Sequence, residues 1–409
     1  MLNIIWLSFF FIAFLSGLYQ FFMLGNNAIF NDITLATFTL SKTAFEISLG
    51  LTGVLCFWMG IMKIGEKSGF IDLLTNFLSP LLKRLMPDVP DKHPALGAMV
   101  MNLSANMLGL DNAATPLGIK AMQHLQTLNP NKDTASNAQI LFLVINTSAV
   151  TLFPLSIFTY RAQMGAADPT DVFIPILIAT YASTIAGLVA VASVQRIRLY
   201  DPVILTYLAG FSGLIGSILW YFSQLDQASM QQQSALVSNF IIFSLIILFM
   251  AGALKRRINV YENFIEGAKE GFSTAVMIIP YLVAMLVAIG VFRASGAMDL
   301  ILQALRSVLN LFAIDDRFVD ALPTAFMKPL SGSGARAMMV ETMQTHGADS
   351  FSGRLASIVQ GSTETTFYVL AVYFGAVGIK NARHALACGL IADFAGIIVA
   401  ILVGYLFFG

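Results

Sequence analysis

Charge is scarce in this sequence. Only 11% of its 409 residues are Asp, Glu, Lys or Arg, whereas 57% are apolar. An average soluble domain has about 25% charged residues, so this chain lacks the charge that keeps a protein of its length in water. The composition excludes a soluble enzyme. It predicts an all-α polytopic membrane protein with the lipid bilayer as its first partner.

Metal-binding and nucleic-acid-binding patterns are also missing. Cys56 and Cys388 are the only cysteines and have no CxxC spacing, which excludes a disulfide framework and a thiolate metal site. None of the four histidines has another histidine at i+4, so no zinc site is predicted. The 23 basic and 23 acidic residues balance and form no long basic run, so we expect no nucleic-acid partner.

Patterns typical of enzymes are absent too. The chain has no paired nucleophile and base, no cluster of metal ligands and no phosphate-binding loop. We therefore expect no cofactor and no enzyme activity. The one alternative is that Asp111 and Glu364 form an acid–base pair acting on a lipid-linked substrate.

Long apolar runs are what the chain has in abundance. Seven of them are long enough to span a bilayer: 2–24, 44–62, 172–194, 203–222, 237–254, 274–292 and 385–408. The first has no basic residue before it and no small-residue cleavage site, so we interpret it as a retained helix and not a signal peptide.

Other apolar segments carry polar or charged residues. Four are interrupted by polar or small residues where a clean helix would have leucine: 94–122, 138–160, 320–344 and 352–378. Two more, 69–86 and 297–313, contain several charges and are predicted to be amphipathic helices lying along the membrane interface.

The short charged loops predict the orientation. Arg196 and Arg198 follow one span and Lys255 to Arg257 follow another, while the loop at 223–236 between the intervening spans has no basic residue. Basic loops face the cytoplasm, so 223–236 is predicted outside. Lys380 and Arg383 precede the last span, which places the C-terminus outside.

Two parts of the chain resemble each other. Ser68-Gly-Phe-Ile-Asp-Leu73 recurs as Ser295-Gly-Ala-Met-Asp-Leu300, and Thr147 to Thr151 align with Ser362 to Thr366. The predicted orientation makes the two copies inverted, which is typical of secondary transporters. We predict a membrane helix at 1–28, a first repeat at 29–195, a two-helix linker at 196–259 and an inverted second repeat at 260–409.

Each copy contains a first polar break. Backbone at membrane depth can leave the helix only where protein or a water-filled cavity satisfies its polar groups, so such breaks are candidate binding sites. The candidate residues here are Asn102, Ser104, Asn106, Asp111 and Asn112 in the first copy, and Ser331, Ser333 and Arg336 in the second. The alternatives are an ordinary loop outside the membrane at 102–116 and an interfacial turn at 328–336.

Each copy contains a second polar break, which we expect to be the tip of a re-entrant hairpin. The candidate substrate-binding residues there are Asn146, Thr147 and Ser148 in the first copy, and Gln360, Ser362, Thr363 and Glu364 in the second. An ionisable residue inside the bilayer is a functional candidate by default, so Glu364, Asp111 and Thr365 are the candidates for binding a coupling cation or proton. The alternative for Glu364 is a structural ion pair with Arg354 or Arg336. For Asp393 in the last span, a role in helix packing and a role in coupling are both open.

These segments resemble a known family. Residues 102–122 (Asn-Leu-Ser-Ala-Asn-Met-Leu-Gly-Leu-Asp-Asn and onward) look like spore maturation protein A. Ile278-Ile-Pro-Tyr-Leu-Val and Gly353-Arg-Leu-Ala-Ser-Ile-Val-Gln-Gly-Ser-Thr-Glu-Thr-Thr look like spore maturation protein B. The chain resembles the two proteins fused, with A over about 1–195 and B over about 260–409.

This resemblance implies a nucleoside-recognition or gate domain, which concentrative nucleoside transporters and the ferrous-iron permease also carry. In those nucleoside transporters a Gln-Thr-Glu triplet at a re-entrant hairpin contacts the nucleobase. Here Gln360 and Thr363-Glu364 are similar but separated by two residues. Related nucleoside transporters are trimers, so the resemblance also implies a homo-oligomer, and the family name implies a phenotype in sporulation.

The sequence therefore predicts a multi-pass protein of the bacterial cytoplasmic (inner) membrane. Its two inverted-topology repeats have re-entrant hairpins and broken helices and are joined by a two-helix linker. The leading hypothesis for its function is secondary active transport of a small polar solute, nucleoside-like by resemblance and coupled to Na⁺ or H⁺. The alternative is a non-transporting membrane scaffold for envelope or cell-wall assembly.

Overall fold

The computed structural model is built from helices. It describes residues 2–90, 93–108, 111–148 and 151–409, without the side chains of 2 and 111–113. These residues contain no strand, only an isolated bridge between Thr134 and Asn381. The predicted all-α class is confirmed.

Seven helices in the described ranges are long and apolar enough to cross a membrane. They are α1 (Leu2–Leu24), α2 (Ile29–Lys67), α8 (Phe173–Gln195), α9 (Pro202–Ser223), α10 (Gln227–Lys255), α11 (Val260–Ala294) and α17 (Ala385–Phe408). Each covers one of the seven predicted spans, except that residue 172 of the third span precedes α8. At 1.5 Å per residue, the 39 residues of α2 extend well beyond a hydrocarbon core of about 30 Å.

Two amphipathic helices lie where the sequence predicts them, α3 (Phe70–Leu85) and α12 (Ala297–Leu311). The buried residues of α3 are all leucines on one face, at 74, 78, 82 and 85. Each helix follows a glycine with a positive φ, 91° at Gly69 and 70° at Gly296. Glycine adopts this backbone conformation at little cost, which explains why the Ser-Gly pair occurs in both copies.

The remaining helices are short. They are α4 (Pro94–Met107), α5 (Asp111–Leu128), α6 (Asn137–Thr147), α7 (Leu155–Gln163), the 3₁₀ helix η1 (Arg317–Ala321), α13 (Leu322–Met327), α14 (Gly332–His346), α15 (Phe351–Ser362) and α16 (Thr366–Gly375). One order therefore occurs twice along the chain: a long helix, an amphipathic helix, two pairs of short helices and a final span.

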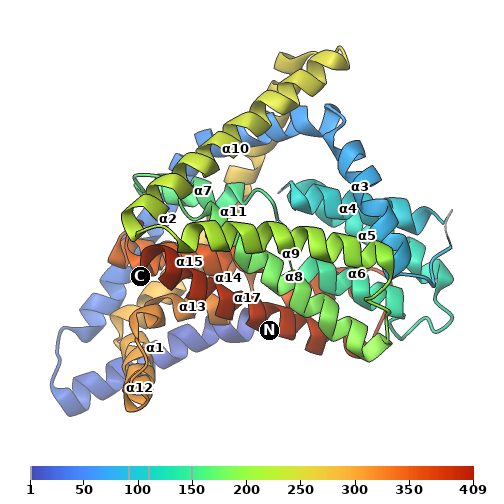
Figure 1. The fold of residues 1–409 in the computed structure, drawn as a ribbon. Coiled ribbons are helices and arrows are strands. Elements are labelled where there is room, and N and C mark those ends of the chain that lie inside the picture. The colour runs from blue at the N-terminus through green and yellow to red at the C-terminus, as the bar shows by residue number, and fades with distance from the viewer. Residues whose placement is uncertain (1, 91–92, 109–110, 149–150) are drawn as a thin grey trace.

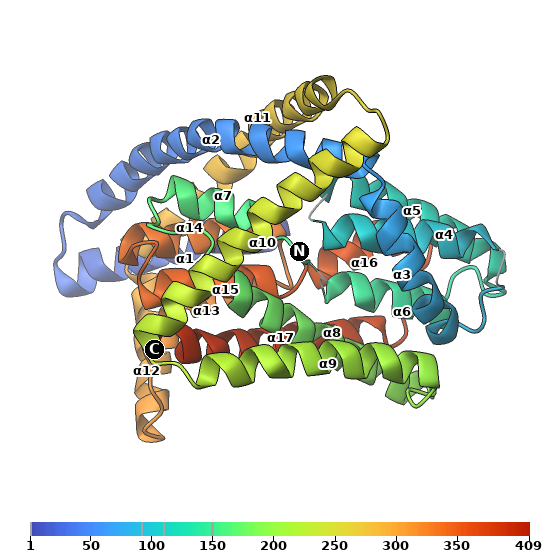
Figure 2. The ribbon, with the colours of Figure 1, turned by 45° about the horizontal axis from the view of Figure 1, so that its top comes forward.

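The position of the hairpins corrects the sequence analysis. The pairs α4–α5 and α13–α14 pack along each other as hairpins. The pairs α6–α7 and α15–α16 do not, and α6 and α7 lie well apart in both views of the ribbon (Figure 1, Figure 2). The helices on either side of the expected hairpin tips at 146–154 and 360–366 thus do not reverse against each other, so each pair is one discontinuous helix. Residues 149–150 of the first tip lie outside the described residues.

The two long helices α2 and α11 pack against each other over much of their length and arch across the molecule (Figure 2). They run antiparallel, because Lys63 pairs with Glu270 at 3.1 Å and Lys67 pairs with Glu266 at 3.0 Å. Gly267 allows the close contact: a Cβ at this position would lie 2.3 Å from the carbonyl oxygen of Met59. Small residues at a helix crossing let backbones approach in this way.

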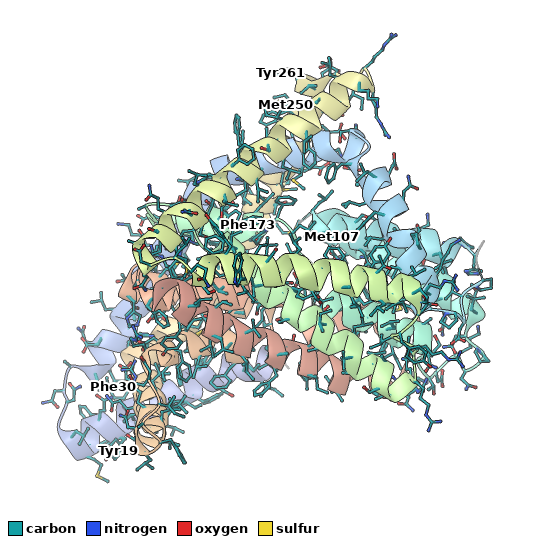
Figure 3. The ribbon with its side chains drawn as sticks, viewed as in Figure 1. Tyr19, Phe30, Met107, Phe173, Met250 and Tyr261 are labelled. Carbon is teal, nitrogen blue, oxygen red and sulfur yellow. The ribbon has the colours of Figure 1, made fainter. Side chains whose placement is uncertain are left out.

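The apolar outer surface and the buried centre are visible in the side chains (Figure 3). Tyr19 of α1 and Tyr261 of α11 lie at two corners of the molecule and are 57% and 73% exposed. Met107, at the end of α4, lies near the middle of the view and is buried.

A buried ion network joins the loop at 164–172 to the loop at 347–350. Arg161 is fully buried, and its Nη2 donates to Oδ1 of Asp171 at 2.8 Å. Arg354 Nε donates to the other oxygen of Asp171 at 2.7 Å, and Asp349 accepts from Arg161 at 3.3 Å. One carboxylate thus holds two arginines from different parts of the chain.

We predict that Gly267→Ala lowers the free energy of unfolding by about 1–3 kcal/mol, because the added methyl group forces α2 and α11 apart. Thermal unfolding of the purified protein in detergent measures this loss. Gly213→Ala in α9 is the matched control, since a Cβ there meets nothing within 4 Å. Equal stability of the two variants would contradict the prediction.

We also predict that Asp171→Asn lowers the free energy of unfolding by about 1.5–3 kcal/mol, because it removes the charge that bonds to both arginines and leaves Arg161 with the longer contact to Asp349. The same thermal assay measures the effect. Asp32→Asn, on the exposed surface of α2, should change stability by less than about 0.5 kcal/mol. An Asp171 variant as stable as this control would show that the network is not needed for the fold.

Candidate functional site

A cavity of about 630 Å³ lies where the short helices meet. Its lining comes from both halves of the chain and combines amides, hydroxyls, one cation, one anion and several aromatic rings. The described residues that line it are Asn106, Thr115, Asn146, Tyr160, Ile278, Tyr281, Leu282, Leu330, Ser331, Gly332, Ser333, Arg336, Glu364, Thr365, Phe367, Tyr368, Val369 and Tyr373. The volume is within the range of about 300–1,000 Å³ typical of small-molecule sites.

Hydrogen bonds between side chains hold the amide side of the cavity. Nδ2 of Asn106 in α4 donates to Oδ1 of Asn146 in α6 at 2.7 Å, and the hydroxyl of Tyr373 donates to the same oxygen at 3.3 Å. Nδ2 of Asn102 donates to Tyr373 Oη at 3.2 Å. Because Tyr373 belongs to α16, this network connects a hairpin and a discontinuous helix of the first half to the second half.

Backbone N–H and C=O groups at the interruptions of the helices form hydrogen bonds with partners in other segments of the chain. The amide N–H of Glu364, between α15 and α16, donates to the carbonyl of Thr147 at the end of α6 at 2.8 Å. Phe367 N donates to Pro329 O at 3.0 Å, and Leu152 N donates to Met107 O at 2.8 Å. Backbone groups freed by the interruptions therefore find partners inside the protein, as an apolar environment requires.

The charged residues of the cavity come from the second half. Arg336 and Glu364 line both this cavity and a smaller adjoining one of about 70 Å³. The guanidinium of Arg336 lies over the ring of Tyr160, 5.7 Å from its centre. Lys328, at the tip of the α13–α14 hairpin, is buried and lines the smaller cavity. Fixed charges of both signs therefore face the two cavities.

Eight of the predicted substrate-binding residues line one of these two cavities. They are Asn106, Asn146, Ser331, Ser333, Arg336 and Glu364 in the larger cavity, with Gln360, Thr363 and again Glu364 in the smaller one, and the coupling candidate Thr365 also lines the larger cavity.

Five other predicted residues are buried but line neither cavity, namely Asn102, Ser104, Thr147, Ser148 and Ser362. Asn102 and Thr147 still support the site through the hydrogen bonds given above. Asp111 and Asn112 begin α5, but their side chains lie outside the described residues. The alternative partner Arg354 is paired with Asp171, so it does not form the ion pair considered for Glu364.

The aromatic residues are the part of the site that the sequence analysis missed. Tyr160, Tyr281, Tyr368 and Tyr373 line the larger cavity, although aromatic residues are so frequent in the sequence that no single one stands out. Pro280, inside α11 and next to Tyr281, was the available signal, because a proline inside an apolar helix marks a departure from regular geometry. Among the described residues, no group of three or more His, Cys, Asp or Glu is arranged to hold a metal ion.

Known proteins show similarity to both halves. A family model described as "Gate: Nucleoside recognition" matches residues 48–166 and 275–380. Spore maturation protein A of Bacillus subtilis (strain 168) is 42% identical over 189 residues, which are 46% of this chain and 93% of that protein. Spore maturation protein B of the same organism is 45% identical over 177 residues, 42% of this chain and 98% of that protein. No solved structure matches the chain.

We predict that Tyr373→Phe lowers the free energy of unfolding by about 1 kcal/mol, because it removes the hydroxyl shared by Asn102 and Asn146. The stacking of the ring on Phe142 remains. Tyr368→Phe, on the same helix and 55% exposed, is the matched control and should change stability by less than about 0.5 kcal/mol. If thermal unfolding shows the same midpoint for both variants, the hydroxyl does not hold the amide network together.

Proposed function

Because the chain belongs to the Gate family of nucleoside-recognition domains, which matches more than half of its residues, we propose that it is a secondary active transporter of a small polar solute. The observation that carries this proposal is the central cavity. Residues from both halves line it at the interruptions of discontinuous helices, and such interruptions are typical of substrate sites in transporters.

The lining favours a nucleoside-like solute. Tyr281, Phe367 and Tyr368 provide apolar faces against which a flat ring can lie. Asn106, Asn146 and Glu364 provide amide and carboxylate groups that pair with the polar edge of such a ring. Ser331, Ser333 and Arg336 are placed to bind hydroxyls or another polar part of the same molecule.

The arrangement of the helices supports alternating access. The same order of elements occurs in the two halves, and the corresponding long helices α2 and α11 pack antiparallel. Two inverted repeats can exchange conformations and open the central site to either side of the membrane in turn. The pair α9 and α10 is the linker that joins the repeats in this proposal.

The driving force proposed is a Na⁺ or H⁺ gradient. Glu364 and Thr365 line the cavity, and with Asp111 they are the candidates for carrying the coupling ion within the substrate site. A carboxylate in a water-shielded site can exchange a proton or bind a cation. The solute is moved without chemical change, so no enzyme activity is proposed.

The setting proposed is a bacterial cytoplasmic membrane with the C-terminus outside. The relatives named above are bacterial, and the seven apolar helices suit a multi-pass protein. The loop at 195–202 carries Arg196 and Arg198, which favours its position inside. A homo-oligomer is also proposed, by analogy with related nucleoside transporters.

We predict that Glu364→Gln reduces ion-driven uptake at least tenfold while the protein still folds. Uptake of radiolabelled uridine and adenosine into proteoliposomes, under an inward Na⁺ or H⁺ gradient, measures the effect. The amide keeps the shape of the side chain but loses its charge and its ability to hold a cation or proton.

Glu46→Gln is the matched control, because Glu46 is exposed on α2 and forms a surface pair with Lys42, at 3.7 Å. This variant should transport like the parent protein. Unaltered uptake by the Glu364 variant would contradict the role of that residue. No uptake of any nucleoside by the parent protein, together with co-purification of a stoichiometric partner, would favour a membrane scaffold instead.

A further inference from the structure

A second polar cluster lies behind the cavity, among α8, α17 and the link between α15 and α16. Oδ1 of Asp393, Oγ1 of Thr363 and Oγ of Ser183 make no hydrogen bond of ordinary geometry to any described residue. The three residues are at most 1% exposed. Buried polar atoms without partners are costly, so those found in a folded protein call for an explanation such as a bound ion.

Gly396 of α17 lies close to two of these residues and to the end of α15. A Cβ placed on Gly396 of α17 would lie 2.7 Å from Thr363 Cγ2, 3.0 Å from Ser183 Cβ and 3.3 Å from the carbonyl oxygen of Ser362. Asp393 precedes Gly396 by three residues on the same helix, and residues at this spacing share a face. Because Gly396 has no side chain, α17 lies close to the link between α15 and α16. The carboxylate of Asp393 then lies beside this link.

A short hydrogen bond to one oxygen holds the carboxylate of Asp393 in place. Its Oδ2 accepts a hydrogen bond of 2.6 Å from Oγ1 of Thr366, the first residue of α16. The side chain of Thr363 also interacts with it. The hydrogen bond to Oδ2 fixes the orientation of the carboxylate. The lone pairs of Oδ1 can therefore coordinate a ligand.

The end of α15 adds further oxygen atoms. This helix ends at Ser362, and Thr363 has extended backbone dihedral angles, φ −147° and ψ 174°. The last carbonyls of a helix have no intrahelical donor, and they carry the negative end of the helix dipole. The carbonyl of Ser362, which lies near Ser183, is one of these groups.

Two other charged residues interact with Asp393. They are Lys328 of the hairpin tip and Glu364 of the link, which have opposite charges. Their effects on a bound cation have opposite signs, because Glu364 attracts it and Lys328 repels it.

We propose that Asp393, Thr363, Ser183 and the carbonyl end of α15 bind a single Na⁺ ion. All of these ligands are hard oxygen atoms, and unwound backbone with helix C-termini is a known environment for Na⁺ in transporters. A proton would occupy Oδ1 of Asp393 alone. A cation coordinated by several lone pairs at once accounts for the hydroxyls from the two other elements as well as for the carboxylate.

The site joins the two halves of the chain. Ser183 belongs to the first half, whereas Thr363 and Asp393 belong to the second. Bound Na⁺ stabilises the link at 363–365, and Glu364 of this link lines the cavity. This coupling role rests on the proposed transport function, but the binding of Na⁺ does not.

Thermal unfolding of the full chain in detergent, without any solute, tests the ion site. Matched ionic strengths of NaCl, KCl and choline chloride separate a specific ion from a general salt effect. We expect 100 mM NaCl to raise the unfolding midpoint by about 3 °C or more over the other two salts, because a ligand of the folded state alone raises its stability. Ser183→Ala and Asp393→Asn should lose this shift.

Ser193→Ala is the matched control, because Ser193 lies on the same helix, is exposed, and bonds only to the carbonyl of Val189. It should keep the Na⁺ shift. Equal midpoints in NaCl and KCl, or a Na⁺ shift retained by Ser183→Ala, would overturn the proposal. A midpoint that depends on pH but not on Na⁺, with the dependence lost in Asp393→Asn, would overturn it in favour of a proton.

This result is separate from the uptake assay. A Na⁺ shift without uptake of any nucleoside would leave the ion site standing and reject the transport function for those solutes. Uptake driven by H⁺ alone, without a Na⁺ shift, would reject the ion site and leave transport standing.

Discussion

Backbone N–H and C=O groups that leave a helix inside an apolar environment must find partners within the protein, because lipid offers none. In this chain the two discontinuous helices and the two hairpins meet at one place. The N–H of Glu364 reaches the carbonyl of Thr147, and that of Phe367 reaches the carbonyl of Pro329. The interruption in one half thus stabilises the interruption in the other, and the cavity forms where they meet.

The cavity that results is chemically different on its two sides. The first half contributes the amides of Asn106 and Asn146, which are held by each other and by Tyr373. The second half contributes Arg336 and Glu364. Two halves with the same order of elements therefore surround the site with different chemistry, which allows a polar, asymmetric solute to be held in one orientation. The polar cluster at Asp393 lies beside the link at 363–365, so a movement of this link would change the cluster.

The sequence predicted part of this site correctly. Glu364 stood out because a carboxylate inside an apolar segment is costly, and Ser331 and Ser333 stood out because they interrupt an apolar run. Tyr373 did not, since one tyrosine among many apolar residues carries no positional signal, and Tyr281 was marked only by the neighbouring Pro280. Ser183 was missed for a similar reason, because a single serine in a membrane helix usually bonds to its own backbone. The tertiary structure shows that its Oγ makes no such bond and that α17 packs against its helix.

The membrane character, the seven spans and the amphipathic helices α3 and α12 were determined by the sequence alone, because hydrophobicity and helical periodicity are local properties. The tertiary structure decided which interruptions are hairpins and which are discontinuous helices. Both kinds have the same local pattern of glycine, proline and hydroxyl residues, and the difference lies in whether the chain reverses against a neighbour. It also decided that Arg161, Asp171 and Arg354 belong to one buried network, because charges far apart in sequence are paired only by the fold.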